Sequence, residues 1–226
     1  MSAVEQVGKV CTVGKATIMN CDCLQYMATL PDKAFDLAIV DPPYGIDYLH
    51  SGGLGTDCVN PKHNRKLHER KDWDLAIPDK SYFDELKRVS QNQIIWGANY
   101  FVENLSASMG WIFWDKGQNL TMSDGELAFS SFERALRRII INRGQLMVEG
   151  GTIHPTQKPI KLYEWLLTNY AKPGQRILDT HLGSGSHAIA CNNLGFELVA
   201  CELDTDYYNA SIERIKQHHA QLRMFA

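Results

Sequence analysis

The chain has 226 residues, of which 44% are hydrophobic and 22% are charged, and its formal net charge is −3. This length and composition predict a single folded domain that spans residues 1–226 and has one sizeable core. The sequence has no run of about 18 apolar residues and does not start with the apolar segment of a signal peptide, so we expect no membrane span and a cytoplasmic location. The net charge disfavours binding of nucleic acid over the whole surface but allows a local basic patch.

The six cysteines are scattered along the chain, and none of them forms a Cys-x-x-Cys pair. Cys21 and Cys23 lie close together in sequence, but no histidines follow at the spacing of a zinc finger. We therefore expect free thiols in a reducing compartment and no metal site.

Short apolar segments alternate along the chain with amphipathic segments, which is typical of an α/β sheet. Because strand segments such as 37–40 are continuously apolar, we expect a doubly wound, mostly parallel sheet with helices on both faces. The predicted strands, in chain order, are residues 16–20, 37–40, 93–96, 111–114, 176–178 and 198–201. The predicted helices are residues 81–89, 159–170, 186–194 and 206–217.

Two long segments, 45–78 and 116–151, have little periodicity, and we expect both to be functional loops because loops of this length are otherwise uncommon. The first contains the basic run KHNRKLHERK at 62–71, and the second contains a short basic stretch at 134–143. These side chains could contact nucleic-acid phosphates, although most charge runs are simply solvated surface. The candidate DNA-binding residues are Arg65, Lys66, Arg70, Lys71, Arg137 and Arg138.

The most informative motif is Asp41-Pro42-Pro43-Tyr44, which directly follows the predicted strand 37–40. The two prolines fix the backbone, so a carboxylate, a carbonyl group and an aromatic ring are held rigidly at the carboxyl end of the strand, where α/β sheets bind ligands. Asp41 and the Pro42 carbonyl can accept both hydrogens of one amino group, and Tyr44 can stack on the base that carries it. The alternative is a rigid turn in which Asp41 only caps a loop.

A second motif, Asp179-Thr-His-Leu-Gly183-Ser-Gly185-Ser, follows the strand 176–178 and precedes a predicted helix. Its glycines allow a ligand to approach the backbone, although their spacing is not that of a pyrophosphate-binding loop. Glu202 ends the next strand, where it can accept hydrogen bonds from two ribose hydroxyls, so the two features together indicate an adenosine-containing cofactor. Asp22 can accept from an adenine amino group, or it can simply cap a helix.

These motifs and HPTQKP at 154–159 resemble those of the S-adenosylmethionine-dependent amino methyltransferases of DNA. Their order, with DPPY first and the glycine turn last, resembles the circularly permuted β group of that family. The segments WGANYF at 96–101 and WIFWDKG at 111–117 look like those of its small phage or prophage members. The resemblance extends from about residue 16 to residue 217 and implies a Rossmann-like sheet of the seven-stranded type.

The resemblance also implies a role for each matching residue. The target amine and its base would be held by Asp41, Pro42, Pro43 and Tyr44. The cofactor would contact Asp22, Thr156, Gln157, Lys158, Asp179, Gly183, Ser184, Gly185, Ser186 and Glu202. In this set the charge of Lys158 suits the carboxylate of the cofactor's amino-acid part. The usual Asp-Pro-Phe before the glycine turn is Asp179-Thr180-His181 here, and we assign no chemistry to His181.

The implied reaction is direct methyl transfer from S-adenosylmethionine to N6 of adenine in double-stranded DNA, without a covalent enzyme intermediate. Aspartate rather than serine before Pro-Pro-Tyr favours adenine N6 over cytosine N4, and an RNA substrate also fits the motifs. A protein of another class, an inactive DNA-binding module that keeps the fold, is the alternative. The joint presence of Asp41, Gly183, Gly185 and Glu202 argues against it.

The last residues, 218–226, are expected to form a mobile tail. The segment QLRMF, from Gln221 to Phe225, resembles the short peptide by which bacterial proteins dock on the replicative sliding clamp, and apolar anchors on a mobile tail suit insertion into a groove. The alternative is that Leu222, Met224 and Phe225 fold back on the domain. A homodimer is a further hypothesis.

Overall fold

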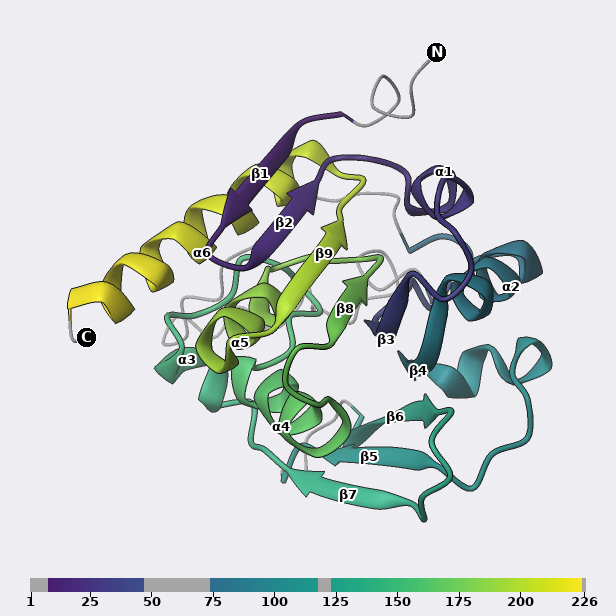
Figure 1. The fold of residues 1–226 in the computed structure, drawn as a ribbon. Coiled ribbons are helices and arrows are strands. Elements are labelled where there is room, and N and C mark those ends of the chain that lie inside the picture. The colour runs from purple at the N-terminus through teal and green to yellow at the C-terminus, as the bar shows by residue number, and fades with distance from the viewer. Residues whose placement is uncertain (1–7, 47–73, 118–122, 225–226) are drawn as a thin grey trace.

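The computed structural model describes residues 8–46, 74–117 and 123–224, which form one mixed β-sheet with helices on both faces (Figure 1). The strands are β1 (Val10–Val13), β2 (Ala16–Met19), β3 (Phe35–Val40), β4 (Ser90–Trp96), β5 (Trp111–Asp115), β6 (Gly125–Ser130), β7 (Arg137–Ile140), β8 (Arg176–Asp179) and β9 (Glu197–Cys201). The α-helices are α1 (Cys23–Ala28), α2 (Lys80–Val89), α3 (Gln145–Val148), α4 (Ile160–Tyr170), α5 (Ser186–Leu194) and α6 (Thr205–Met224). Two 3-10 turns, η2 (Ala98–Tyr100) and η3 (Val102–Asn104), follow β4.

The strand order across the sheet is β1-β2-β9-β8-β3-β4-β6-β5-β7. Strands β2, β9, β8, β3 and β4 run parallel to one another, whereas β1 is antiparallel to β2 and β6 is antiparallel to β4 and β5. From β8 the chain continues through α5 to β9 on one side, and from β3 it continues through α2 to β4 on the other. The order therefore reverses between β8 and β3, and in open α/β sheets ligands bind at the carboxyl ends of the strands at such a point.

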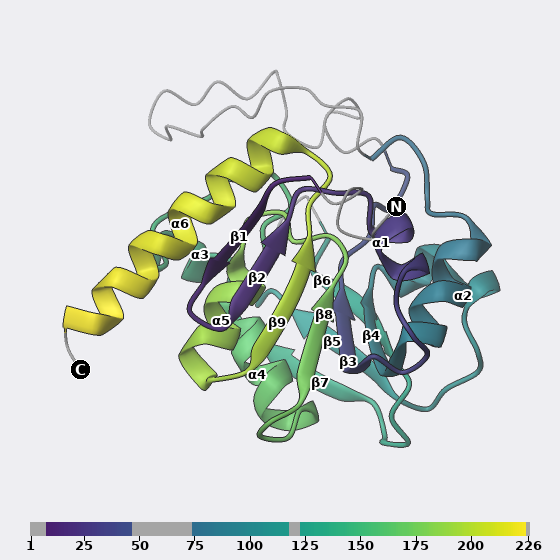
Figure 2. The same ribbon diagram turned by 45° about the horizontal axis from the view of Figure 1, so that its top comes forward.

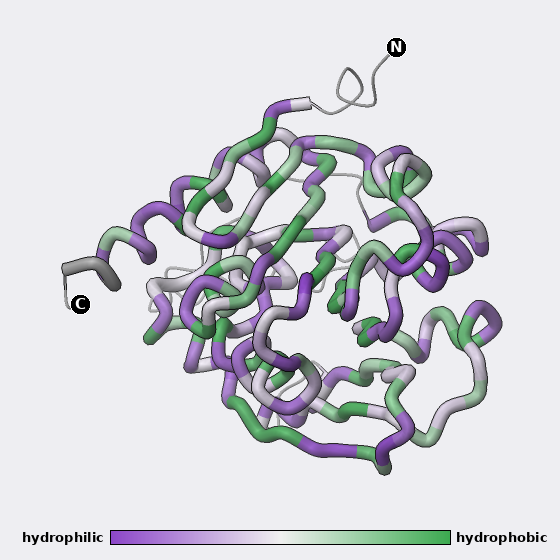
Figure 3. The backbone as a smooth tube through the Cα atoms, viewed as in Figure 1, coloured by the Kyte–Doolittle hydropathy of each residue, from purple (hydrophilic) through white to green (hydrophobic). Residues whose placement is uncertain are grey.

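The sheet separates two helical layers (Figure 2). Helices α1 and α2 cover one face, and α4, α5 and α6 cover the other, so both faces of the central strands are buried. Strand β3 shows the consequence, because Leu37 and Ile39 belong to the core under α4–α6 while Ala38 and Val40 belong to the core under α1 and α2. Burial on both sides explains why these strands read as continuous apolar runs. Figure 3 shows hydrophobic residues concentrated on the central strands and hydrophilic ones along much of α6.

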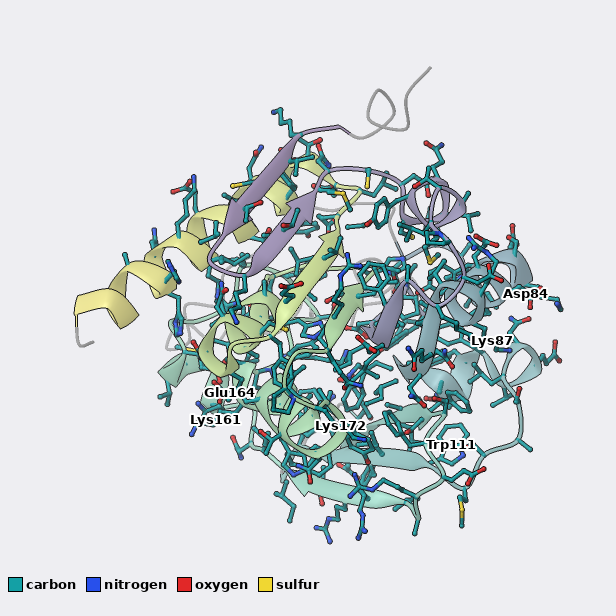
Figure 4. All side chains as sticks on the ribbon, viewed as in Figure 1. Asp84, Lys87, Trp111, Lys161, Glu164 and Lys172 are labelled. Atoms are coloured by element: carbon teal, nitrogen blue, oxygen red, sulfur yellow. The ribbon has the colours of Figure 1, made fainter. Side chains whose placement is uncertain are left out.

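The helices follow the amphipathic pattern that the sequence predicts. In α2, Phe83 and Leu86 are fully buried, whereas Asp84 is exposed and Lys87 lies at the edge of the packed face. Figure 4 shows Asp84 and Lys87 on the outer side of this layer, and Lys161 and Glu164 on α4. Such a distribution buries one apolar stripe of each helix against the sheet.

The structure contains all six predicted strands and all four predicted helices, with ends that differ by a few residues. It adds β1, which forms a hairpin with β2 around Gly14, where φ is +60°. Two short apolar segments separated by two residues that include a glycine are a hairpin signal, so β1 could have been found from the sequence. With nine strands in the described residues, the sheet has two more than the seven-stranded type that the resemblance implies.

Two predicted boundaries are wrong. Segment 116–151 is not a loop throughout, because it contains β6, β7 and α3. Residues 218–224 are not a tail, because α6 continues through them to Met224, and Figure 1 shows its last turns projecting past the sheet. Most of segment 45–78 and residues 225–226 lie outside the described residues. Among the described helices, none combines the length and the apolar composition that crossing a bilayer requires.

Candidate active site

The tetrapeptide Asp41–Tyr44 leaves the carboxyl end of β3, next to β8, at the point where the strand order reverses. Asp41 and Pro43 face two cavities at once. We name them by a residue of each: the Tyr44 cavity, of about 740 Å³, and the Gly183 cavity, of about 610 Å³. Both volumes are in the range of small-molecule sites in proteins. Asp41, Pro43 and Thr156 line both cavities, so the motif stands at the boundary between them.

The Gly183 cavity lies over the turn between β8 and α5. Gly183 and Gly185 both have positive φ, of +54° and +78°, a conformation that glycine adopts without strain. A side-chain carbon on Gly185 would also lie 3.0 Å from Ile215, so glycine is needed there to pack the turn against α6. Arg214 on α6 braces the same turn, since its Nη1 donates to the Ser184 carbonyl oxygen and to Ser186 Oγ, each at 2.9 Å.

Asp179 lies behind this turn and holds its shape. Its Oδ1 accepts from the His181 amide at 3.0 Å, and its Oδ2 lies 2.9 Å from His187 Nδ1. The His181 side chain lines the cavity and contacts Thr180 Oγ1 through Nδ1 at 2.9 Å. Burial lowers the pKa of His181 to about 4, so its ring is neutral at physiological pH, in accord with a structural role.

Carboxylates line the Gly183 cavity on the side of β2 and β9, among them Glu202 and Asp22. Glu202 Oε2 accepts from the Gly183 amide at 2.8 Å, and its Oε1 accepts from the Asp204 amide at 2.9 Å. Burial raises the pKa of Glu202 to about 7 despite these two bonds. Asp22 caps α1, because its Oδ1 accepts from the amides of Leu24 at 2.7 Å and Gln25 at 3.3 Å. The capping role that the sequence allowed for Asp22 is thus present, on a residue that also lines the cavity.

The Tyr44 cavity contains a buried network of charged groups. Lys158 Nζ lies 2.5 Å from Asp41 Oδ2 and 3.0 Å from Glu126 Oε2. Lys116 Nζ lies 2.9 Å from Glu126 Oε1, so two cations alternate with two carboxylates. The Tyr44 hydroxyl donates to Asp41 Oδ1 at 2.6 Å and accepts from Lys158 Nζ at 3.2 Å. The Lys158 side chain is only 2% exposed, and it is therefore held by these partners rather than by water.

The pKa values of the two carboxylates in the network are shifted in opposite directions. Burial by itself would raise the pKa of Glu126, but Lys158 and Lys116 together lower it to about 2. Burial raises the pKa of Asp41, and the attraction of Lys158 offsets only part of that effect. The pKa of Lys158 is raised, because Asp41 and Glu126 outweigh the opposing effect of burial. Glu126 is thus the fixed anion of the network, and Asp41 is the carboxylate that more readily takes a proton.

The ring of Tyr44 packs against two other aromatic side chains. Tyr100 stacks on it with 5.2 Å between ring centroids and 15° between planes, and Phe101 meets it edge-on at 6.1 Å. Gly97 lies against the ring as well. In this arrangement Tyr100 occupies the kind of stacking position in which we expected a base.

Of the residues that the resemblance assigns to the cofactor, some line the Gly183 cavity and others do not. Gln157 and Lys158 line the Tyr44 cavity, not the Gly183 cavity. Gln157 also braces its own loop, because its Nε2 donates to the Gly151 carbonyl oxygen and its Oε1 accepts from the Ile153 amide, both at 3.0 Å. Asp179, Gly185 and Ser186 line neither cavity. Those that line the Gly183 cavity are Asp22, Thr156, Gly183, Ser184 and Glu202.

Of the candidate DNA-binding residues, Arg65, Lys66, Arg70 and Lys71 lie outside the described residues. Arg137 and Arg138 are exposed on β7, and Arg138 Nη2 lies 2.6 Å from Asp115 Oδ2. Farther along, Arg143 lines the Tyr44 cavity. In the parts of the chain that the structure describes, no cluster of three or more histidine, cysteine or acidic side chains is placed to hold a metal ion.

Sequence reasoning missed Glu126, Lys116 and Arg214. Lys116 follows β5 and Glu126 lies near the start of β6, which is antiparallel to β5, so both reach the edge of the sheet where Asp41 lies. The antiparallel direction of β6 is what brings Glu126 to the same edge as Asp41. The sequence signals this position only if β6 is recognised as a strand.

Two curated proteins are similar to this chain over most of its length. A curated protein of Escherichia coli (strain K12), YubD, named as a candidate methylase, is 23% identical over 208 residues, which cover 86% of this chain and 87% of that protein. The type II methyltransferase M.HinfI of Haemophilus influenzae is 21% identical, over 89% of this chain and 68% of its own length.

Two solved structures have the same fold. The complex of M1.HpyAVI with SAM matches with a TM-score of 0.57 and 20% identity, over 88% of this chain and 99% of that one. The PvuII DNA methyltransferase, described as cytosine-N4-specific, matches with a TM-score of 0.58 and 12% identity, over 93% of each chain. Identities this low establish the architecture alone.

A family profile makes the assignment specific. The profile of the N6/N4 DNA methylases matches residues 95–213, more than half of the chain. The matched region includes HPTQKP and the glycine turn, and Asp41–Tyr44 precedes it. The chain therefore belongs to the N6/N4 family of DNA methylases.

Proposed function

We propose that this protein transfers a methyl group from S-adenosylmethionine to N6 of adenine in double-stranded DNA. The observation that carries the proposal is the position of Asp41 and Pro43, which line both cavities. A group-transfer enzyme needs two ligands that meet at one point, and here a rigid carboxylate stands at that point. The Gly183 cavity would hold the cofactor, and the Tyr44 cavity would hold the base.

The residues of the Gly183 cavity fit the cofactor. Its lining includes the glycine turn at Gly183, where a ligand can lie close to the backbone. Glu202 is placed at the end of β9, where a carboxylate can accept from ribose hydroxyls, and Asp22 lies on the same wall for an adenine amino group. M1.HpyAVI, which shares the fold, was solved with SAM bound.

S-adenosylmethionine supplies an electrophilic methyl carbon on a positively charged sulfur. Asp41 and the carbonyl oxygen of Pro42 would accept the two hydrogens of the target amine, which directs its lone pair toward the Gly183 cavity. Each oxygen of Asp41 already has one partner, and a carboxylate oxygen can accept a second hydrogen bond. The new bond between nitrogen and the methyl carbon would replace the carbon–sulfur bond, so that the cofactor leaves as the neutral thioether S-adenosylhomocysteine. The nitrogen would then lose one proton, and the raised pKa of Asp41 suits that carboxylate to receive it.

The base would reach this position by leaving the duplex. An enzyme that acts on the amine of a stacked base must flip the nucleotide out, and aromatic side chains hold the flipped base. Tyr44 and Tyr100 supply two rings at the mouth of the Tyr44 cavity, and Tyr100, which is 43% exposed, is the ring that would move to admit a base. The exposed arginines of β7 would contact phosphates of the duplex.

Aspartate before Pro-Pro-Tyr supports adenine as the target base. Cytosine N4 remains the competing target, because the family includes both chemistries and the Tyr44 cavity would accept either amine. RNA remains a competing substrate, because flipping and stacking serve it equally. Docking on a sliding clamp and formation of a homodimer stay predictions.

The test is to incubate the protein with S-adenosylmethionine bearing a deuterated methyl group and unmethylated double-stranded DNA. The DNA is then digested and its nucleosides are analysed by mass spectrometry. We expect labelled N6-methyladenine from the wild-type protein and none from Asp41→Ala. Labelled N4-methylcytosine alone would overturn adenine as the target, and transfer to RNA alone would overturn DNA as the substrate. Cofactor binding without any transfer would favour the inactive DNA-binding module.

A further inference from the structure

The position of Lys158 conflicts with the role that the resemblance implies for it. Lys158 lines the Tyr44 cavity and not the Gly183 cavity. Its ammonium group contacts the carboxylates of Asp41 and Glu126. It is also within 5.5 Å of the Trp96 ring centroid, on the inner side of the cavity. A cation fixed here faces the site of the base rather than the amino-acid part of the cofactor.

We propose that Lys158 reads the target base by donating a hydrogen bond to the ring nitrogen beside the target amine, which is N1 in adenine, and that Glu126 holds it there. This inference rests on the proposed function, because it names the group that recognises the base of that same site.

The chemistry of the base matches the pair of side chains. In adenine the amine and N1 are bonded to the same carbon, so a hydrogen-bond donor and an acceptor lie side by side on one edge. Asp41 Oδ2 and Lys158 Nζ, 2.5 Å apart, present an acceptor and a donor side by side. The corresponding edge of thymine has a carbonyl group beside an N–H group, which is the reverse polarity. The pair would therefore favour an aminated ring and reject thymine.

The hydrogen bonds of Lys158 leave one position for the base. An ammonium group has three donors, and here they point to Asp41, Glu126 and the Tyr44 hydroxyl. The contact with the neutral Tyr44 oxygen is the longest, at 3.2 Å, and it is the one that a ring nitrogen would replace. The two carboxylates keep the charge of Lys158 while the third donor changes partner.

Glu126 is a positioning residue in this scheme. It joins Lys158 to Lys116, which is itself only 11% exposed in its side chain, and so gives the ammonium group a second anionic partner besides Asp41. Without Glu126, Lys158 would have Asp41 as its single anionic partner, and the carboxylate needed for the amine would be more strongly occupied.

The test changes one atom of the substrate and leaves the protein intact. Duplexes carrying the recognition sequence, mapped from methylated genomic DNA, are made with adenine, 1-deazaadenine or 7-deazaadenine at the target position. Removal of N1 should lower the kcat/KM of the wild-type protein by roughly 10-fold to 100-fold, the range expected for a hydrogen bond from a charged donor. Removal of N7, which is not beside Lys158 in this scheme, should have a much smaller effect.

Combining protein variants with the base analogues tests whether Lys158 and N1 interact with each other. Lys158→Gln should methylate adenine and 1-deazaadenine with similar kcat/KM, and Glu126→Gln should discriminate between them less than the wild-type protein does. Affinity for S-adenosylmethionine, measured by calorimetry, should be unchanged in Lys158→Gln and confirms that the variant is folded. Lys161→Gln, an exposed lysine of α4, is the matched control and should behave as wild type.

Three results would overturn the inference. They are equal activity of the wild-type protein on adenine and 1-deazaadenine, full discrimination retained by Lys158→Gln, and a loss of cofactor affinity in that variant, which would return Lys158 to the cofactor. If the nucleoside analysis instead gives N4-methylcytosine, the proposed function has failed. In that case 3-deazacytosine, which lacks the corresponding ring nitrogen, tests Lys158 separately.

Discussion

Gly97 lies so close to Tyr44 that a side-chain carbon at position 97 would fall 2.1 Å from the tyrosine ring. Gly97 follows β4 and has a φ of +68°, and the ring it contacts belongs to the motif after β3. No real side-chain carbon tolerates such a distance, so an alanine would have to displace the ring. The orientation of Tyr44 at the active site thus depends on a glycine in the neighbouring strand's turn.

The first prediction is that Gly97→Ala impairs methyl transfer. The displaced ring would lose its hydrogen bond to Asp41 and its stacking on Tyr100, and we expect kcat/KM to fall by about tenfold or more, since two interactions are lost together. Cofactor affinity, measured by calorimetry, should change little because Gly97 does not line the Gly183 cavity.

Gly174→Ala is the matched control for that variant. Gly174 also has a positive φ, of +84°, but a side-chain carbon there would meet no atom within 4 Å. Backbone strain should lower the stability of both variants by about 1–2 kcal/mol, and Gly97→Ala should lose more because it also displaces the Tyr44 ring. Only Gly97→Ala should lose activity. Similar activities of the two variants would show that contact with the Tyr44 ring is irrelevant.

The second prediction concerns Asp41. Asp41→Asn keeps the shape of the side chain but removes its charge and half of its capacity to accept hydrogens, so methyl transfer should fall by about 100-fold or more. The fold should survive, because Lys158 keeps its contact with Glu126. The measurement is the rate of methyl transfer together with the melting temperature, and Asp84→Asn on the outer face of α2 is the control. A variant with near wild-type turnover would remove Asp41 from the reaction.

Both motifs that define the site could be recognised from sequence, and their meeting could be anticipated. Parallel strands bring their carboxyl ends to one edge of a sheet. Asp41 directly follows β3, Asp179 is the last residue of β8, and these two strands are parallel neighbours. Rigid prolines and positive-φ glycines need no distant partner to take their conformation. Local chemistry and strand direction were sufficient for this part of the site.

The charged residues that β6 and its neighbours bring to the Tyr44 cavity could not be predicted in this way. Strand β6 starts with Gly125 and Glu126, and β7, at the edge of the sheet, starts with Arg137 and Arg138, so neither is apolar over its whole length as β3 nearly is. Glu126 acquires its low pKa only from lysines that the fold brings to it. For the same reason the position of Lys158 beside Asp41 and Glu126 could not be read from the sequence, because both acids are distant from it along the chain.

The third prediction is a pH dependence of cofactor affinity. Burial raises the pKa of Glu202 to about 7, so the carboxyl group is largely protonated below that pH and ionised above it. The ionised form accepts hydrogen bonds more strongly than the protonated form, which also turns one oxygen into a donor, and affinity for S-adenosylmethionine should therefore rise as the pH increases through about 7. Calorimetric titrations across this range measure the effect, and Glu202→Gln should bind more weakly and lack this rise. Parallel pH profiles for the two proteins would exclude Glu202 as the source.

The same group predicts the sign of a stability change. The folded-state pKa of about 7 lies above the ordinary value of 4.5, so between these pH values the folded protein binds more protons than the unfolded chain. The contribution of Glu202 to the free energy of unfolding must therefore decrease as the pH rises across that window. Denaturant titrations of the wild-type protein and Glu202→Gln, compared at both ends of the window, isolate this contribution.

The last prediction concerns Glu149, which caps a helix from a distance. Helix α4 begins after Pro159, which provides no side-chain cap, and Glu149 instead accepts from the Ile160 amide at 2.8 Å and from the Lys161 amide at 3.4 Å. Glu149→Ala should lower the free energy of unfolding by about 1 kcal/mol, as loss of a helix cap does, and speed hydrogen exchange at Ile160. Glu213→Ala, at an exposed position of α6, is the control. If both variants unfold at the same denaturant concentration, this capping contact contributes nothing to stability.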